Sequence, residues 1–193
     1  MMSPSLNKHL EPVFEILLPE LEKAGIEYWV YGGVSIAAFA EKFIRENKDV
    51  DIFVKETEFE STRSILDNLC NQNNFRLISC KPLRRTQRPK LEIKIDKRER
   101  LSVVPVYLKD NMVEFRFEKG LEKYRCQILE KVERNISGYR FFTPPNEYIK
   151  SVFKNYLTSR PDKKNKPKIQ TDAKAILTPN ELDQFYPPSR RVR

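Results

Sequence analysis

The 193-residue chain has few of the side chains that histidine- or cysteine-based chemistry needs. Its single histidine, His9, lies in an N-terminal amphipathic segment, where a surface or packing role is expected. The three cysteines, Cys70, Cys80 and Cys126, do not have the spacing of a metal site and cannot all pair with one another. The sequence therefore disfavours histidine acid–base catalysis and zinc binding, and its cysteine usage fits a reducing cytoplasm.

The sequence also lacks a long apolar segment. No run approaches the ~20 apolar residues of a membrane-spanning helix, and the N-terminal sequence MMSPSLNKHLEP has no signal-peptide core. We therefore expect a soluble, cytoplasmic protein that does not bind membranes. With 39% hydrophobic and 33% charged residues, the chain can bury one substantial core and has room for a second, small helical lobe.

Basic residues are concentrated in the later part of the chain. Residues 1–60 contain 6 Lys/Arg and 12 Asp/Glu, and because the whole chain has a net charge of +9, residues 61–193 have a net charge of +15. The densest basic segment, Lys81–Lys90, contains two prolines and no acidic residue. We expect an extended loop that places Arg84, Arg85 and Arg88 near polyphosphate or RNA, because clustered cations bind phosphates. The alternative is an ordinary solvated loop.

The most informative segment, residues 27–54, begins with a strand and a glycine turn. Tyr28–Tyr31 is a short aromatic and β-branched run suited to a buried strand, and Gly32 and Gly33 end it. Residues 34–43 then have apolar side chains at helical spacing. The glycines thus lie where a strand enters a helix. Exposed backbone N–H groups and the helix dipole make such a corner attractive to phosphate, and glycine allows close approach.

The same segment ends with two aspartates one residue apart. If residues 50–54 form a strand, Asp49 and Asp51 lie on one face, opposite the apolar side chains of Val50, Ile52 and Val54. Both carboxylates therefore point the same way and can hold a divalent metal. A phosphate-binding turn next to a carboxylate pair indicates phosphoryl or nucleotidyl chemistry.

This order of Gly-Gly, helix and Asp-hydrophobic-Asp resembles the DNA polymerase β-like nucleotidyltransferase superfamily, a class of enzymes (EC 2.7.7-type). The segment is most similar to the AbiEii/AbiGii-type toxin nucleotidyltransferases and to the lincosamide and aminoglycoside nucleotidyltransferases. The resemblance implies that Gly32 and Gly33 grip a nucleoside triphosphate and that Asp49 and Asp51 hold Mg²⁺. Residues 34–48 separate Gly33 from Asp49, slightly more than in the compact family pattern.

The family also has a third carboxylate on a neighbouring strand. In residues 90–96, KLEIKID, alternation places Glu92 and Asp96 on the face opposite the apolar residues. We favour Glu92 as the third acid, acting as general base and metal ligand; the alternative, Asp96, lies beside a turn expected at 97–100. Where some relatives carry an aspartate on the next strand, this chain has Ser102. Loss of the third acid would leave a nucleotide-binding pseudoenzyme.

Four further residues are candidates for nucleotide binding. Ser35 would lie in the first helical turn, as a phosphate contact or a helix-start serine, and Lys48 immediately precedes Asp49. In the toxin and antibiotic nucleotidyltransferases a helical tail carries basic residues followed by Asp-x-x-x-hydrophobic, which Lys168, Asp172 and Ile176 resemble. The resemblance implies that Lys163 and Lys168 bind the triphosphate as mobile point charges. The alternative is that these lysines only face water.

The periodicity predicts an α/β (α+β) fold, with a mixed β-sheet nucleotidyltransferase core flanked by helices and a small C-terminal helical region. Helices are expected at 7–24, 34–43, 57–70, 146–157 and 169–177. Strands are expected at 28–31, 50–54, 75–80, 90–96, 101–108, 112–118 and 137–142. We expect a core at 1–143, a helical region at 144–186 and a disordered tail at 187–193.

We predict Mg²⁺-dependent transfer of a nucleoside monophosphate from an NTP to a hydroxyl acceptor. The preferred acceptor is RNA, such as the end of a tRNA, because a cationic aminoglycoside would favour a more acidic pocket. This would suit the toxin of a toxin–antitoxin or phage-defence system, with an antitoxin protein as partner. Two alternatives stay open: an antibiotic-modifying nucleotidyltransferase, and a catalytically silent RNA- or partner-binding module.

Overall fold

A computed structural model describes residues 6–80, 89–117 and 120–187. Arg84, Arg85 and Arg88 of the expected basic loop lie outside the described residues, as do residues 188–193 of the expected tail. Within the described residues, no helix is both long enough and apolar enough to cross a membrane.

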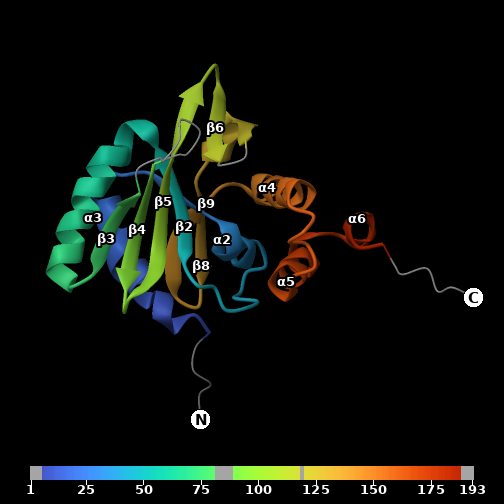
Figure 1. Cartoon of the computed structure of the whole chain (residues 1–193), viewed down its shortest axis with the longest axis horizontal. Coiled ribbons are helices and arrows are strands. Elements are labelled where there is room, and N and C mark those ends of the chain that lie inside the picture. The colour runs from blue at the N-terminus through green and yellow to red at the C-terminus, as the bar shows by residue number, and fades with distance from the viewer. Residues whose placement is uncertain (1–5, 81–88, 118–119, 188–193) are drawn as a thin grey trace, which may run out of the picture.

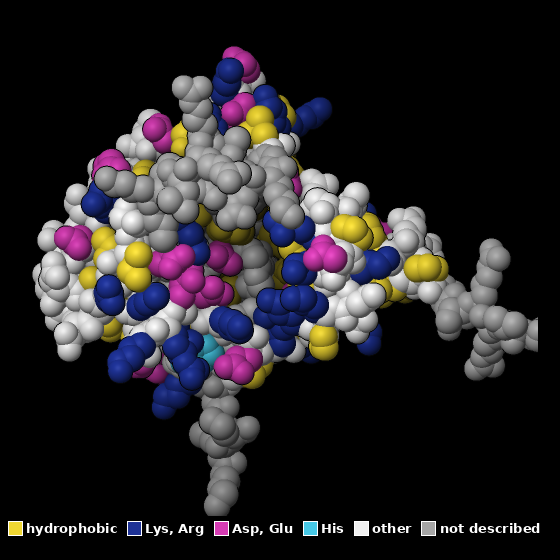
Figure 2. Space-filling model, viewed as in Figure 1, with side chains coloured by type: hydrophobic (Ala, Val, Ile, Leu, Met, Phe, Trp, Pro, Cys, Tyr) yellow, Lys and Arg dark blue, Asp and Glu magenta, His cyan; other side chains and the backbone are white. Residues whose placement is uncertain are grey.

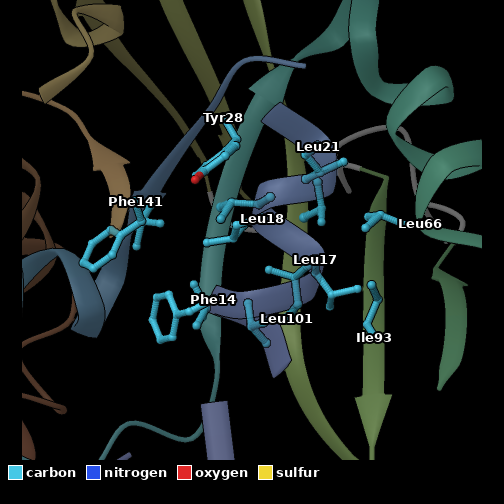
Figure 3. Packing of buried hydrophobic residues seen from close by; sticks show 14 of the residues in the cluster. Phe14, Leu17, Leu18, Leu21, Tyr28, Leu66, Ile93, Leu101 and Phe141 are labelled. Carbon is cyan, nitrogen blue, oxygen red and sulfur yellow. The ribbon is translucent and has the colours of Figure 1, made fainter. Parts of the chain in front are cut away.

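The N-terminal helical segment packs its apolar residues against one face of a sheet. It consists of a 3₁₀ turn, η1 (Lys8–Leu10), a π-helix, η2 (Val13–Leu17), and α1 (Leu18–Lys23). Figure 3 shows Phe14, Leu17, Leu18 and Leu21 pointing toward the strands, with Leu66 closing one side of the cluster. All five side chains are buried. Burial of such side chains stabilises the fold by about 1.5–3 kcal/mol each.

The central sheet has the strand order β1-β2-β5-β4-β3. Its strands are β1 (Tyr28–Tyr31), β2 (Val50–Lys55), β5 (Arg98–Lys109), β4 (Lys90–Ile95) and β3 (Arg76–Cys80). The β2–β5 pair is parallel, and the other pairs along this order are antiparallel. The far end of β5 pairs with β6 (Met112–Phe117), which pairs with β7 (Gly120–Arg125).

The remaining elements flank this sheet (Figure 1). α2 (Gly32–Phe39) follows β1 directly, and η3 (Glu56–Glu58) leads into α3 (Phe59–Asn73). After η4 (Cys126–Leu129), the strands β8 (Val132–Ile136) and β9 (Tyr139–Thr143) form a separate hairpin. The chain ends in α4 (Asn146–Ser159), α5 (Pro167–Ile176) and α6 (Pro179–Phe185). The predicted mixed α/β architecture is confirmed, but β7, β8 and α6 were not predicted.

The two faces of the sheet have different surroundings. One face packs against the N-terminal helices and α3, and Val50, Ile52, Leu91, Ile93 and Leu101 are buried there. The other face carries an aromatic cluster, in which the Trp29 ring stacks on Phe53 at 5.3 Å between centroids. Trp29 Nε1 donates a hydrogen bond to the Leu129 carbonyl at 3.1 Å.

A third apolar cluster attaches the C-terminal helices to α2. It joins Ile36 of α2 to Ile149 and Phe153 of α4 and to Ile169 and Ile176 of α5. Figure 1 shows α4 and α5 next to α2, on the side of the molecule away from α3. The helices therefore lie beside the turn that joins β1 to α2.

Candidate active site

The turn between β1 and α2 needs glycine for two separate reasons. Gly32 has a left-handed backbone with φ of 69°, and a Cβ there would lie 2.8 Å from Asp51 Oδ2. A Cβ on Gly33 would overlap Asn47 Oδ1 and lie 2.5 Å from Arg45 Nη2. Contacts this short do not occur for real side chains, so the backbone of the turn packs directly against a carboxylate and a guanidinium.

Asp51, Ser102 and Glu92 form a row across three adjacent strands. Asp51 on β2 lies opposite Ser102 on β5, and Ser102 lies opposite Glu92 on β4. Residues paired across strands share a face, and this is the face opposite the N-terminal helices. Adjacent strands lie ~4.8 Å apart, so the Asp51 and Glu92 backbones are about 10 Å apart with Ser102 between them. The Ser102 hydroxyl donates a hydrogen bond to Asp51.

The surroundings of Asp51 disfavour its ionised carboxylate, which a bound cation would stabilise. Burial raises the pKa of Asp51 to about 7, and the charge of nearby Asp49 contributes to the increase. Lys90 and the Ser102 hydrogen bond act in the opposite direction. Two carboxylates that repel each other next to the glycine turn supply the oxygen ligands that Mg²⁺ prefers. The residues present therefore fit a divalent metal at Asp49 and Asp51.

Glu92 belongs to a separate ionic group. Lys90 Nζ donates to Glu92 Oε1 at 2.9 Å and to Glu99 Oε1 at 2.7 Å. Figure 2 shows acidic side chains gathered in the middle of this face, over β2, β5 and β4. Within the described ranges, no three His, Cys, Asp or Glu side chains converge closely enough to form a metal site. Asp49, Asp51 and Glu92 thus lie in one region without surrounding a common point.

A cavity of about 590 Å³ extends from the glycine turn and Asp51 toward α4 and α5. Arg45, Lys168 and Asp172 are among its lining residues, and Arg45 lies next to Gly33 of the turn. Aromatic side chains line much of the rest, namely Tyr31, Phe115, Tyr124, Tyr148, Phe153 and Tyr156. A volume of this order accommodates a nucleotide or a drug-sized molecule.

The model of the aminoglycoside-2''-adenylyltransferase family matches residues 13–98 of this chain. A structure of the lincosamide antibiotic adenylyltransferase LnuA, bound to lincomycin, is 17% identical, with 90% of this chain and 100% of that chain covered and a TM-score of 0.56. A structure of ANT(2'')-Ia in complex with adenylyl-2''-tobramycin is 14% identical, with 93% of this chain and 95% of that chain covered and a TM-score of 0.60. The protein has the polymerase β-like nucleotidyltransferase fold. The nucleotidyltransferase fold predicted from the sequence is confirmed.

Another nucleotidyltransferase structure has the same arrangement. A putative nucleotidyltransferase from Thermotoga maritima is 15% identical, with 81% of this chain and 90% of that chain covered and a TM-score of 0.57. None of the curated protein sequences matches this chain significantly.

The structure places some of the predicted nucleotide-binding residues at the cavity and others away from it. Ser35 is buried, and its hydroxyl donates to the Gly32 carbonyl at 2.8 Å, which is a helix-start contact. Lys168 lines the cavity. Lys163 is paired with Asp162 at 3.4 Å, and Lys48 is exposed just before the aspartates. Their roles in binding nucleotide stay predictions.

Asp96 is also placed by the structure. It lies exposed in the β4–β5 turn with φ of 51°. That position agrees with a turn residue, and Glu92 is the acid that shares the row with Asp51.

Arg45 and Asp172 form a contact that the sequence analysis did not predict. Arg45 Nε and Nη2 donate to the two carboxylate oxygens of Asp172 at 2.7 and 2.8 Å, and Nη1 donates to Asn47 Oδ1 at 2.8 Å. The pair joins the segment after α2 to α5, and Asp172 is buried. The Asp-x-x-x-hydrophobic pattern drew attention to Asp172, but nothing in the sequence indicates its partner 127 residues away.

His9 has a structural role in the same segment. His9 Nε2 donates to the Asn47 carbonyl at 2.7 Å, and Asn7 Oδ1 accepts a hydrogen bond from the Asn47 backbone amide at 2.6 Å. The segment between α2 and β2 is therefore fixed from both ends of the chain, by the N-terminal residues and by α5.

Proposed function

We propose that the protein is a divalent-metal-dependent nucleotidyltransferase that transfers a nucleoside monophosphate from an NTP to an acceptor hydroxyl. The observation that carries the proposal is the contact between the Gly32 backbone and the Asp51 carboxylate, with Asp49 close by. A phosphate on the glycine turn and a metal on the aspartates would meet at this point. The nucleotidyltransferases found in the comparisons support this reaction class.

In this proposal each residue has one task. The amides of Gly32 and Gly33, at the N-terminus of α2, bind phosphate oxygens, and Lys168 adds a positive charge beside them. Asp49 and Asp51 hold Mg²⁺, which when bound stabilises charge on the attacking and leaving oxygens. The acceptor oxygen bonds to the α-phosphorus, pyrophosphate leaves, and the proton of the acceptor hydroxyl passes to Glu92.

The cavity and Glu92 lie on opposite sides of Asp51. Tyr31, Asp51 and Phe53 of β1 and β2 line the cavity, whereas Glu92 lies two strands beyond β2. We therefore place the nucleotide in the cavity, with its base among the aromatic rings. The acceptor approaches over β5 and β4.

RNA is our preferred acceptor. Residues 61–193 have a net charge of +15 and include the strands over which the acceptor approaches. Figure 2 shows Lys and Arg side chains around the acidic group on this face. These cations would contact the phosphates of a polyanion, and such binding would weaken as salt is raised. A toxin role with an antitoxin partner is one biological setting for this activity.

A small hydroxylated antibiotic is the second candidate acceptor. The family model names aminoglycoside 2''-adenylylation, and two similar structures contain lincomycin or adenylyl-2''-tobramycin. The aromatic lining of the cavity would also suit a ring-containing ligand of low charge.

Transfer of label from NTPs to an acceptor tests the enzyme assignment and distinguishes the two acceptor classes. The protein is incubated with Mg²⁺ and labelled NTPs, together with total RNA or a panel of hydroxylated antibiotics. We expect label on RNA and its loss in Asp49→Asn/Asp51→Asn. Glu92→Gln should lower the rate about 10²- to 10⁴-fold, while the matched control Asp96→Asn should not. Transfer that survives the double substitution, or none to either acceptor class, would remove the enzyme assignment.

A further inference from the structure

The ammonium group of Lys90 lies between two carboxylates of the candidate active site. Its Nζ donates to Glu92 at 2.9 Å and to Glu99 at 2.7 Å. The side chains of Lys90, Glu92 and Glu99 are 28%, 21% and 28% exposed. Charge-assisted hydrogen bonds between partly buried groups hold all three side chains in place.

A backbone irregularity places Glu99 in this group. Lys90 and Glu92 share a face of β4 because they lie two residues apart on a strand. On β5, strict alternation from Ser102 would turn Glu99 toward the opposite face. A register shift after Ile93 instead pairs Glu99 with Lys94, so Glu99 faces the same way as Glu92. The contact with Lys90 therefore depends on a bulge next to the site.

The same ammonium acts on the aspartate side of the site. Lys90 attracts Asp51, whereas Asp49 and Glu99 repel it. Between Asp51 and Glu92 the cross-strand row has Ser102, which offers a hydroxyl instead of a carboxylate. A divalent ion bridging Asp51 and Glu92 would lack an acidic ligand in the middle and would meet a positive charge.

We propose that Lys90 takes the place of a second divalent cation in this site. It neutralises Glu92 and Glu99 as a fixed charge and leaves Asp49 and Asp51 to bind a single ion. Glu92 is thereby positioned as a proton acceptor and is withheld from metal binding. This inference rests on the proposed function, because that function places the metal on the aspartates.

Binding of Mn²⁺ alone, followed by the electron paramagnetic resonance signal of the free ion, tests the proposal. We expect the wild-type protein to bind one ion. Lys90→Met removes the ammonium and leaves Glu92 and Glu99 without a cation, so this variant should bind one ion more than the wild type. Lys90→Arg keeps the charge and can contact both carboxylates, so it should bind as the wild type does.

Lys97→Met is the matched control, because it removes the same charge from the exposed β4–β5 turn. It should bind one ion. The proposal is overturned if the wild type binds two ions, if Lys90→Met gains none, or if Lys97→Met or Lys90→Arg gains one. If circular dichroism shows that Lys90→Met is unfolded, Lys90→Gln takes its place, because it also removes the charge and its amide can still donate to a carboxylate; it should bind one ion more than the wild type, and no gain would overturn the proposal.

Asp51→Asn separates this proposal from the proposed function. If the aspartates hold the metal, Asp51→Asn loses the ion that the wild type binds. Retention of that ion would contradict the metal site of the proposed function. The difference in ion count between the wild type and the Lys90 variants would still test Lys90 itself.

Discussion

Among single residues, Gly32 is constrained both by its left-handed backbone and by its contact with Asp51. Gly32 and Gly25 have nearly the same left-handed backbone, with φ of 69° and 74°, but a Cβ would meet Asp51 only at Gly32. Both Gly→Ala variants should lose about 1–2 kcal/mol of unfolding free energy, because alanine is strained in a left-handed backbone. We expect Gly32→Ala to lose about 1–3 kcal/mol more, from overpacking, in urea unfolding. Equal losses at the two sites would show that the contact with Asp51 is easily relieved.

The carboxyl of Asp51 should make stability depend on pH. Its pKa is raised to about 7 in the folded protein, against ~3.9 in an unfolded chain. Between these values the folded state binds more protons, so the free energy of unfolding falls as pH rises through this window. Without divalent metal, Asp51→Asn should be more stable than the wild type by about 1–2 kcal/mol at pH 8 and should show no such gain at pH 4.

Urea unfolding at several pH values measures this gain. A difference that does not change with pH would contradict the prediction. Added Mg²⁺ provides an internal check, because it should stabilise the wild type at pH 8 and leave Asp51→Asn unchanged.

The sequence was sufficient to predict the local part of the site, because Gly32, Gly33, Asp49 and Asp51 lie within one strand–helix–strand unit. Alternation within β4 also placed Glu92 on the correct face. The ionic contact of Glu99 with Lys90 could not be predicted, because it depends on a bulge that alternation does not reveal. The chemical roles of these acids stay predictions.

At the scale of whole elements, the Arg45–Asp172 pair fixes α5 to the segment that precedes β2. The side chains are 18% and 3% exposed, so removing one partner leaves a buried charge without its counterion. Asp172→Asn should therefore cost about 3–5 kcal/mol in urea unfolding. Glu20→Gln, which breaks the exposed Lys23–Glu20 pair, should cost under about 1 kcal/mol. Similar costs for both variants would contradict a structural role for the buried pair.

Helix α6 should be sensitive to acid. The carboxylate of Glu181 accepts hydrogen bonds from Lys150 and Lys154 and caps the helix at Thr178, which lowers its pKa well below the usual range. A lowered pKa stabilises the folded state above the unfolded value of ~4.3, and this contribution is lost as pH falls further. Glu181→Gln should therefore loosen α6 at pH 7 and have a smaller effect at pH 2, as amide exchange of α6 would show. An equal effect of Glu181→Gln at both pH values would contradict a stabilising role for the ionised Glu181 carboxylate.

Most elements were predictable where apolar residues repeat at a regular spacing. The helix expected at 7–24 is realised as η1, η2 and α1, and the strands of the central sheet lie close to their expected bounds. β7, β8 and α6 were missed. These are short elements whose exposed residues interrupt the pattern, and α6 is stabilised by its cap and its ion pairs.

For the molecule as a whole, the cavity between the sheet and the C-terminal helices should determine nucleotide affinity. Tyr148 and Tyr156 of α4 line it, whereas the half-buried Tyr107 does not. Stacking of a base on an aromatic ring contributes about 1–3 kcal/mol. Tyr156→Ala should therefore weaken binding of a non-hydrolysable NTP by about tenfold or more, measured by calorimetry. Tyr107→Ala is the control, and equal affinities in the two variants would argue against nucleotide in the cavity.

Trp29 gives the molecule a built-in optical reporter. It is the sole tryptophan in the chain, it is almost fully enclosed, and its ring rests on Phe53, whose other neighbours border the cavity. Emission from this indole thus originates at a single known place, two residues ahead of the strand's end. A ligand that settles against Phe53 or the adjacent turn would alter its colour or intensity, so occupancy can be followed in unlabelled protein.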